Sequence, residues 1–71
     1  MTHTIAAELV GTVLNVVVKE GDVVSTGDTI VVLESMKMEI PVLTECDGVV
    51  RELAVREGDN VQEGDVLAVV E

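Results

Sequence analysis

Phenylalanine, tyrosine and tryptophan are absent from these 71 residues, and Cys46 is the only cysteine. Without aromatic side chains the core has to be built from valine, leucine, isoleucine and alanine, and a composition rich in β-branched residues favours strands. A single cysteine excludes an intrachain disulfide, so we expect a reducing compartment, the cytoplasm. The chain start resembles no export signal, and no apolar run approaches the roughly 20 residues of a membrane span. We therefore expect no membrane partner.

Basic side chains are also scarce. Lysine and arginine number 4 against 14 aspartates and glutamates, and the formal net charge is -10. Such a chain repels phosphate backbones and anionic lipid surfaces, so nucleic acid is not an expected partner. The acidic side chains form either an ordinary solvated surface, which we favour, or a docking surface for a basic partner enzyme.

Groups that could perform catalysis or bind a metal are few. His3 is the only histidine, and one histidine with Cys46 is too small a set for a zinc site, which needs three or four such ligands. Calcium-binding loops and phosphate-binding loops have no counterpart in the sequence. A chain of this length forms one domain, residues 1–71, and has little room for a deep cleft of its own. We therefore do not expect an independent enzyme.

The chain contains an internal repeat, which appears when residues 2–34 are laid on residues 39–71. The identities are Glu8 with Glu45, Gly11 with Gly48, Val13 with Val50, Val18 with Val55, Glu20-Gly21-Asp22 with Glu57-Gly58-Asp59, Val24 with Val61, Gly27-Asp28 with Gly64-Asp65, Val32 with Val69 and Glu34 with Glu71. Glycine and aspartate mark tight turns, and the alternating apolar residues between them predict antiparallel strands.

Eight strands are predicted, at residues 4–8, 11–18, 22–25, 29–34, 39–44, 48–55, 59–62 and 66–71. The fold class is all-β, a flattened antiparallel sandwich or barrel of two four-stranded sheets with a pseudo-twofold axis. We expect the two repeats to pack against one another through their apolar faces. Neither half is expected to fold alone.

Residues 35–38 are the only internal segment outside the two repeats. They join two predicted strands at a distance that allows only a tight hairpin, so Lys37 should point into solvent. Pseudo-symmetry places the two chain termini at the opposite end of the molecule. Met36 and Met38 are unusual beside a turn, and they either fold onto the edge of the core or form a surface for partners.

The sequence Glu34-Ser35-Met36-Lys37-Met38 resembles the attachment motif of the biotinyl/lipoyl attachment domain family, whose biotinyl branch usually has Glu-Ala-Met-Lys-Met. The flanking Gly-x-Val and Gly-Asp-x-Val-x-x-Gly patterns of that family occur once on each side of the motif. Lipoyl domains usually carry Asp-Lys-Ala at this turn, so biotin is favoured. Ser35 departs from the usual alanine, and residues 44–45 depart from an Ala-Pro pair. The short segment before residue 30 resembles small, free-standing biotin carboxyl carrier proteins that lack a thumb loop.

The resemblance implies a function for each residue of the motif. Lys37 would attack the carbonyl of biotinyl-adenylate on a biotin protein ligase and form an amide, while Glu34, Ser35, Met36 and Met38 would form the surface that the ligase and other partners recognise. Covalently bound biotin would then move a carboxyl group from a biotin carboxylase to a carboxyltransferase, usually for an acyl-CoA. The alternatives are a lipoyl or dual carrier, an unmodified interaction module, and a biotinylated protein that serves no carboxylase.

Overall fold

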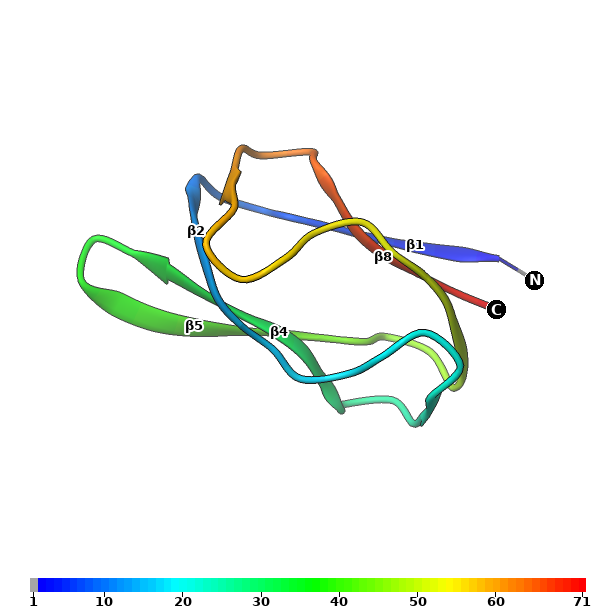
Figure 1. Ribbon diagram of the computed structural model, residues 1–71. Coiled ribbons are helices and arrows are strands. Elements are labelled where there is room, and N and C mark those ends of the chain that lie inside the picture. Colours follow the sequence, from blue (N-terminus) through cyan, green and yellow to red (C-terminus); the bar gives the residue numbers. More distant parts are fainter. Residues whose placement is uncertain (1) are drawn as a thin grey trace.

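Eight strands and no helix make up residues 2–71, the part of the chain that the computed structural model describes (Figure 1). The strands are β1 (His3–Ala6), β2 (Gly11–Val16), β3 (Val23–Val24), β4 (Thr29–Ser35), β5 (Met38–Leu43), β6 (Gly48–Leu53), β7 (Asn60–Val61) and β8 (Val66–Val70). The predicted all-β fold is confirmed, and every strand boundary lies close to its predicted position. In this part of the chain there is no helix of the length and apolar character that a membrane span needs.

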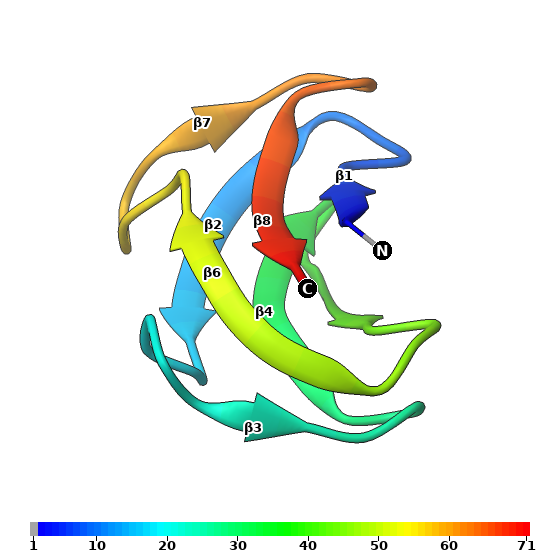
Figure 2. The same cartoon turned by 90° about the vertical axis from the view of Figure 1, so that its right-hand side faces the viewer.

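Two four-stranded antiparallel sheets form the two layers, with strand orders β1-β8-β6-β3 and β5-β4-β2-β7 (Figure 2). Each sheet therefore contains two strands from each repeat. The expectation that the repeats pack as separate units is wrong, because the chain changes sheet at every connection except the one between β4 and β5. The two repeats interleave instead, and the β4–β5 hairpin is the one place where consecutive strands pair.

Four tight turns explain why the Gly-Asp pair recurs. In each turn the glycine has a φ between 92° and 95°, a region that costs glycine little, and the following aspartate accepts a hydrogen bond from the backbone N–H three residues earlier. These backbone–carboxylate pairs are Lys19 with Asp22, Ser25 with Asp28, Arg56 with Asp59 and Gln62 with Asp65, at 2.8 to 2.9 Å. The turn at residues 25–28 connects β3 directly to β4, which leaves no thumb loop.

The core lies between the two sheets and consists of aliphatic side chains from both repeats. Its least exposed members are Val13, Ile30, Val31, Leu33, Val50, Leu67, Ala68 and Val70. Val13 and Val50 occupy equivalent positions in the two repeats, as do Ile30 and Leu67. Burial of these side chains is the main stabilising contribution in a domain without aromatic residues.

The loop at residues 44–47 contains polar contacts that the first repeat lacks. Thr44 is buried and its hydroxyl donates to the carbonyl of Cys46 at 2.8 Å, whereas the equivalent residue in the first repeat is Ala7. Asp47 accepts hydrogen bonds at Oδ1 from the Thr26 backbone N–H at 2.6 Å and from the Thr26 hydroxyl at 2.9 Å. These hydrogen bonds lower the pKa of Asp47 below its usual value of 3.8. The bond from the Thr26 backbone has the larger effect and the bond from its hydroxyl the smaller, while desolvation acts in the opposite direction.

Candidate functional site

The β4–β5 hairpin ends in a two-residue turn made of Met36 and Lys37. Their φ angles are 53° and 65°, so both lie in the left-handed region that a type I′ hairpin turn requires. For residues other than glycine this conformation costs about 1–2 kcal/mol each, and asparagine or glycine is the usual occupant. The pairing of Ser35 with Met38 and of Glu34 with Glu39 closes the hairpin directly behind the turn. The backbone of Lys37 is therefore held in one conformation by the strands on both sides.

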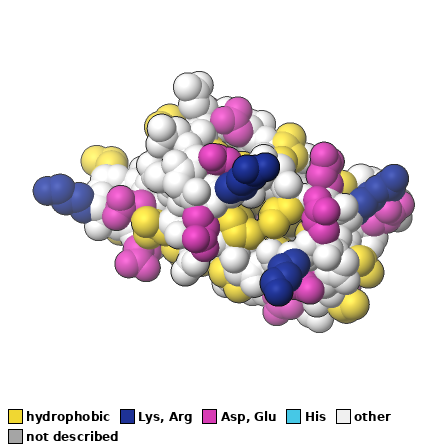
Figure 3. Space-filling view, in the orientation of Figure 1, with side chains coloured by type: hydrophobic (Ala, Val, Ile, Leu, Met, Phe, Trp, Pro, Cys, Tyr) yellow, Lys and Arg dark blue, Asp and Glu magenta, His cyan; other side chains and the backbone are white. Residues whose placement is uncertain are grey.

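The side chain of Lys37 is exposed at this turn, as predicted. Within residues 2–71 it forms no ion pair and no side-chain hydrogen bond; the salt bridge of this part of the chain joins Arg51 to Glu71 at 2.6 Å. Its amine is thus accessible for acylation without first breaking an internal contact. The space-filling view shows the hairpin standing out from the body of the molecule with a basic tip and acidic and apolar side chains behind it (Figure 3).

Met36 and Met38 flank the lysine as an exposed apolar surface. Met36 is 91% exposed and Met38 is 63% exposed, so neither folds onto the edge of the core. Of the two placements considered from the sequence, the structure has the one that presents both thioethers to solvent. The structure thus has a flexible, apolar and exposed side chain on each side of Lys37 in the sequence.

Two carboxylates face one another behind the turn. Glu34 and Glu39 are directly opposed in the β4–β5 register, and both are exposed. Like charges at opposed positions destabilise a strand pair, and the positive charge of Lys37 at the tip offsets part of that repulsion. Ser35 is half-buried beside them. All five residues predicted for the site therefore lie together at the end of one hairpin: Glu34, Ser35, Met36, Lys37 and Met38.

Gly11 packs against the base of this hairpin, a role that was not predicted from the sequence. A Cβ atom at Gly11 would lie 2.7 Å from the carbonyl oxygen of Glu34 and 3.6 Å from the Cβ of Ser35. Gly48 has the same relation to Glu71, where the corresponding distance is 2.6 Å. The signal was present in the sequence, because Gly11 and Gly48 are equivalent in the repeat and neither precedes an aspartate.

The start of β1 and the end of β8 lie at the other end of the molecule from the hairpin (Figure 1), as expected from pseudo-symmetry. His3 pairs with Val70 there, so the first and last strands are neighbours. The Cα atoms extend over 32 × 17 × 17 Å. The amine of Lys37 is therefore displayed far from both ends of the chain.

The sequence profile of a protein family described as "Biotin-requiring enzyme" matches residues 2–70. The chain belongs to this biotin/lipoyl family. The match covers both repeats and the turn between them, and it confirms the family resemblance drawn from the Met-Lys-Met motif. It also agrees with biotin as the cofactor that the motif favoured over lipoate.

Similar biotin/lipoyl proteins include a biotinylated protein TB7.3 homolog of Mycolicibacterium smegmatis, 63% identical over 43 residues that cover 61% of this chain and 61% of that protein. The methylmalonyl-CoA carboxyltransferase 1.3S subunit of Propionibacterium freudenreichii subsp. shermanii is 60% identical over 35 residues, 49% of this chain and 28% of that subunit. The chain thus matches less than two thirds of the length of these relatives. The urea carboxylase of Kluyveromyces lactis superposes with a TM-score of 0.94 and 31% identity over 100% of this chain and 6% of that one.

Proposed function

We propose that Lys37 is the residue to which biotin is attached, and that this domain is a non-catalytic carrier. The observation that carries the proposal is the position of Lys37, an exposed amine without an internal partner at the tip of a conformationally fixed turn between two exposed methionines. One similar protein is named as a biotinylated protein, which supports biotin attachment, and another as a carboxyltransferase subunit, which supports a carrier role. The single cysteine favours the cytoplasm as the site of action.

The chain contributes presentation to the attachment reaction and leaves the chemistry to the ligase. Amide formation removes a proton from Nζ of Lys37 as it attacks the carbonyl of biotinyl-adenylate, and the biotin protein ligase would accept that proton. One amide bond forms and AMP leaves. Because the turn already fixes the backbone of Met36 and Lys37, docking orders fewer groups than the capture of a lysine on a mobile tail.

Attached biotin would accept a carboxyl group at a biotin carboxylase and release it at a carboxyltransferase, with an acyl-CoA as the acceptor. The residues of this chain would position and present that group. Acylation removes the positive charge of Lys37 and leaves Glu34 and Glu39 as the charged groups of the tip. Met36 and Met38 would form the contact surface that the ligase and the two enzyme sites share.

Attachment at Lys37 is tested by intact mass after co-expression with a biotin protein ligase. We expect the mass increase of one biotinyl group in the wild-type chain and none in Lys37→Arg, because a guanidinium stays protonated and cannot be acylated in place of the amine. Lys19→Arg is the matched control, since Lys19 is an exposed lysine in a different turn, and it should be biotinylated in full. An unchanged mass increase in Lys37→Arg would refute the assignment.

The carrier role is tested separately with the biotinylated chain. Incubation with a purified biotin carboxylase, ATP and labelled bicarbonate should place label on the wild-type domain and none on Lys37→Arg. A biotinylated domain that acquires no label from carboxylases known to act on carrier domains would leave attachment intact and exclude carboxyl transfer. A lipoyl carrier would instead gain a lipoyl mass increase when it is incubated with a lipoate ligase.

A further inference from the structure

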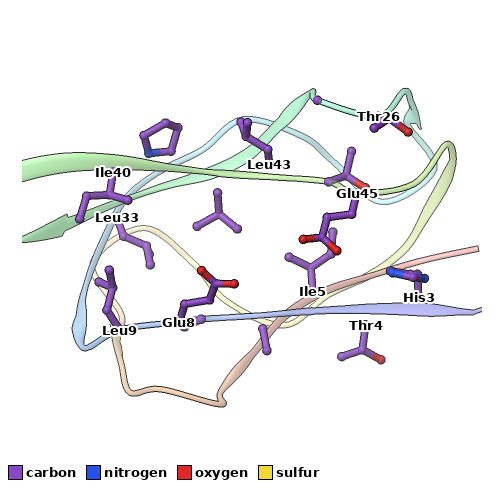
Figure 4. A pocket seen from close by; sticks show the side chains of 16 residues that line it. His3, Thr4, Ile5, Glu8, Leu9, Thr26, Leu33, Ile40, Leu43 and Glu45 are labelled. Carbon is purple, nitrogen blue, oxygen red and sulfur yellow. The ribbon is translucent and has the colours of Figure 1, made fainter.

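An open groove runs along the side of the sandwich between β1 and β5 (Figure 4). These two strands are equivalent in the repeat, and each lies at one edge of its sheet. The groove has a volume of about 700 Å³, within the range of ordinary ligand sites. Its floor is apolar and includes Ile5, Leu9, Leu33, Ile40 and Val42. The groove is separate from the exposed turn that carries Lys37.

Both strands that border the groove have one unpaired edge. Within residues 2–71, β1 pairs only with β8 and β5 pairs only with β4, and no strand pairing joins β1 to β5. Backbone N–H and C=O groups that point outward along such an edge are free to pair with an added strand. The edge of β1 has no proline, whereas Pro41 of β5 has no N–H to donate, so β1 is the better edge for pairing. Addition of an extended peptide to a sheet edge is a common mode of protein recognition, in which alternate side chains occupy the adjoining pockets.

Two carboxylates face into the groove from opposite sides. Glu8 lies on the connection after β1 and Glu45 on the connection after β5, and Figure 4 shows both side chains pointing inward across the groove. Neither carboxylate has a side-chain hydrogen bond or an ion pair within the described chain. The lysines and arginines of this chain lie outside the groove lining, and His3 is the one lining residue with a basic side chain.

We propose that this groove binds an extended segment of a partner protein in which apolar and basic side chains alternate. The apolar side chains would cover the floor, the backbone would pair with the free edge of β1, and lysine or arginine would approach Glu8 and Glu45. A second copy of this chain is a poor occupant, because its formal net charge is also -10. Such a partner would hold the body of the domain while the hairpin tip stays accessible.

The proposal is tested by NMR titration of the full ¹⁵N-labelled chain with a blocked six-residue peptide of alternating valine and lysine. We expect amide shifts concentrated in residues 3–9 and 40–45, with little change at the hairpin turn. The Glu8→Lys/Glu45→Lys double variant should bind at least about tenfold more weakly, since two attractive pairs become repulsive. The Glu52→Lys/Glu57→Lys variant changes the net charge equally outside the groove, and its affinity should fall by less than about threefold.

Several outcomes would overturn the proposal. Shifts centred on residues 34–39, equal weakening in the two double variants, or equally tight binding of a peptide with glutamine in place of lysine would each do so. The proposal would also be overturned if millimolar peptide caused no amide shift. Self-association of the free chain in sedimentation, lost in Glu8→Lys/Glu45→Lys, would instead assign the groove to a second copy. The ¹⁵N spectra of the free variants establish that each is folded, and the lysine at position 37 stays unmodified throughout, so the result is independent of biotin.

Discussion

Met36 and Lys37 occupy backbone conformations that glycine and asparagine adopt more readily. Their φ values could not be predicted from the sequence, because neither residue type favours the left-handed region and only the loop length pointed to a tight hairpin. A strained backbone conformation persists only where the surrounding structure enforces it. Here the pairing of β4 with β5 on both sides of the turn enforces it. The choice of these two residues at the turn therefore favours side-chain function over stability.

Replacement of Met36 by glycine tests this trade between function and stability. Met36 is almost fully exposed, so its removal loses little burial while glycine relieves the left-handed strain. We expect the free energy of unfolding to stay unchanged or to rise by up to about 1 kcal/mol, and the rate of biotinylation to fall. Val23→Gly is the control, because it removes another exposed apolar side chain, but from a strand. We expect its free energy of unfolding to fall by about 1 kcal/mol when both variants are measured by urea titration. Equal losses in the two variants would contradict the account of the turn.

Asp47 gives the fold a specific response to acid. The pKa of its carboxyl group is lowered in the folded state by the hydrogen bonds from Thr26, so the ionised form stabilises the fold above the unfolded value of 3.8. This contribution is lost as the pH falls through the lower, folded pKa. We expect the stability difference between wild type and Asp47→Asn to be constant well above pH 3.8 and to shrink as the pH falls below 3.8 through the lower, folded pKa. Urea unfolding of both proteins at a series of pH values measures this difference.

At the scale of elements, the hairpin differs from every other connection. All others carry the chain from one sheet to the other, whereas β4 and β5 continue side by side and extend beyond the body (Figure 1). The sequence indicated this place, because the residues between the two repeats fall there. It did not indicate how the hairpin is supported, since the close approach of Gly11 to Glu34 depends on the pairing of β2 with β4.

Gly11→Ala should disturb the base of the hairpin through a direct backbone clash. The new Cβ would lie 2.7 Å from the Glu34 carbonyl oxygen, closer than such atoms pack, so β2 and β4 must separate. We expect a loss of about 2 kcal/mol in the free energy of unfolding, together with amide shift changes across residues 34–39. Val10→Ala alters the neighbouring, exposed side chain and should change neither quantity appreciably. A Gly11→Ala chain with an unaltered hairpin spectrum would show that the contact relaxes without consequence.

At the scale of the whole molecule, the repeat predicted the strands and the opposite placement of Lys37 and the termini, but it did not predict which strands pair. Periodicity identifies the buried face of a strand and carries no information on its neighbours in the sheet. The sandwich interleaves the repeats, so β6 of the second repeat lies between β8 and β3. The repeat also showed that Glu8 and Glu45 are equivalent. The groove that they share could not be predicted, because it depends on the order of the strands in the two sheets.

Interleaving predicts that neither repeat forms a structure alone. A fragment of residues 1–36 would carry strands β1 to β4, of which only β2 and β4 pair with one another, and the rest of its apolar surface would be exposed. We expect an unfolded circular dichroism spectrum for this fragment and for residues 37–71, and a β-sheet spectrum when the two are mixed at equal concentration. A folded single fragment would contradict the interdependence of the repeats, and the intact chain at the same concentration provides the reference spectrum.

The neighbouring positions of the first and last strands have a practical consequence for handling the protein. A reporter, a bead or a second domain joined to either end would be attached at one pole of a particle about 32 Å long, with Lys37 at the opposite pole. Immobilised through a terminal tag, every molecule would turn the same face outward. The domain is therefore suited to oriented display on a solid support, where access of an enzyme to the lysine is limited by diffusion and not by the anchor.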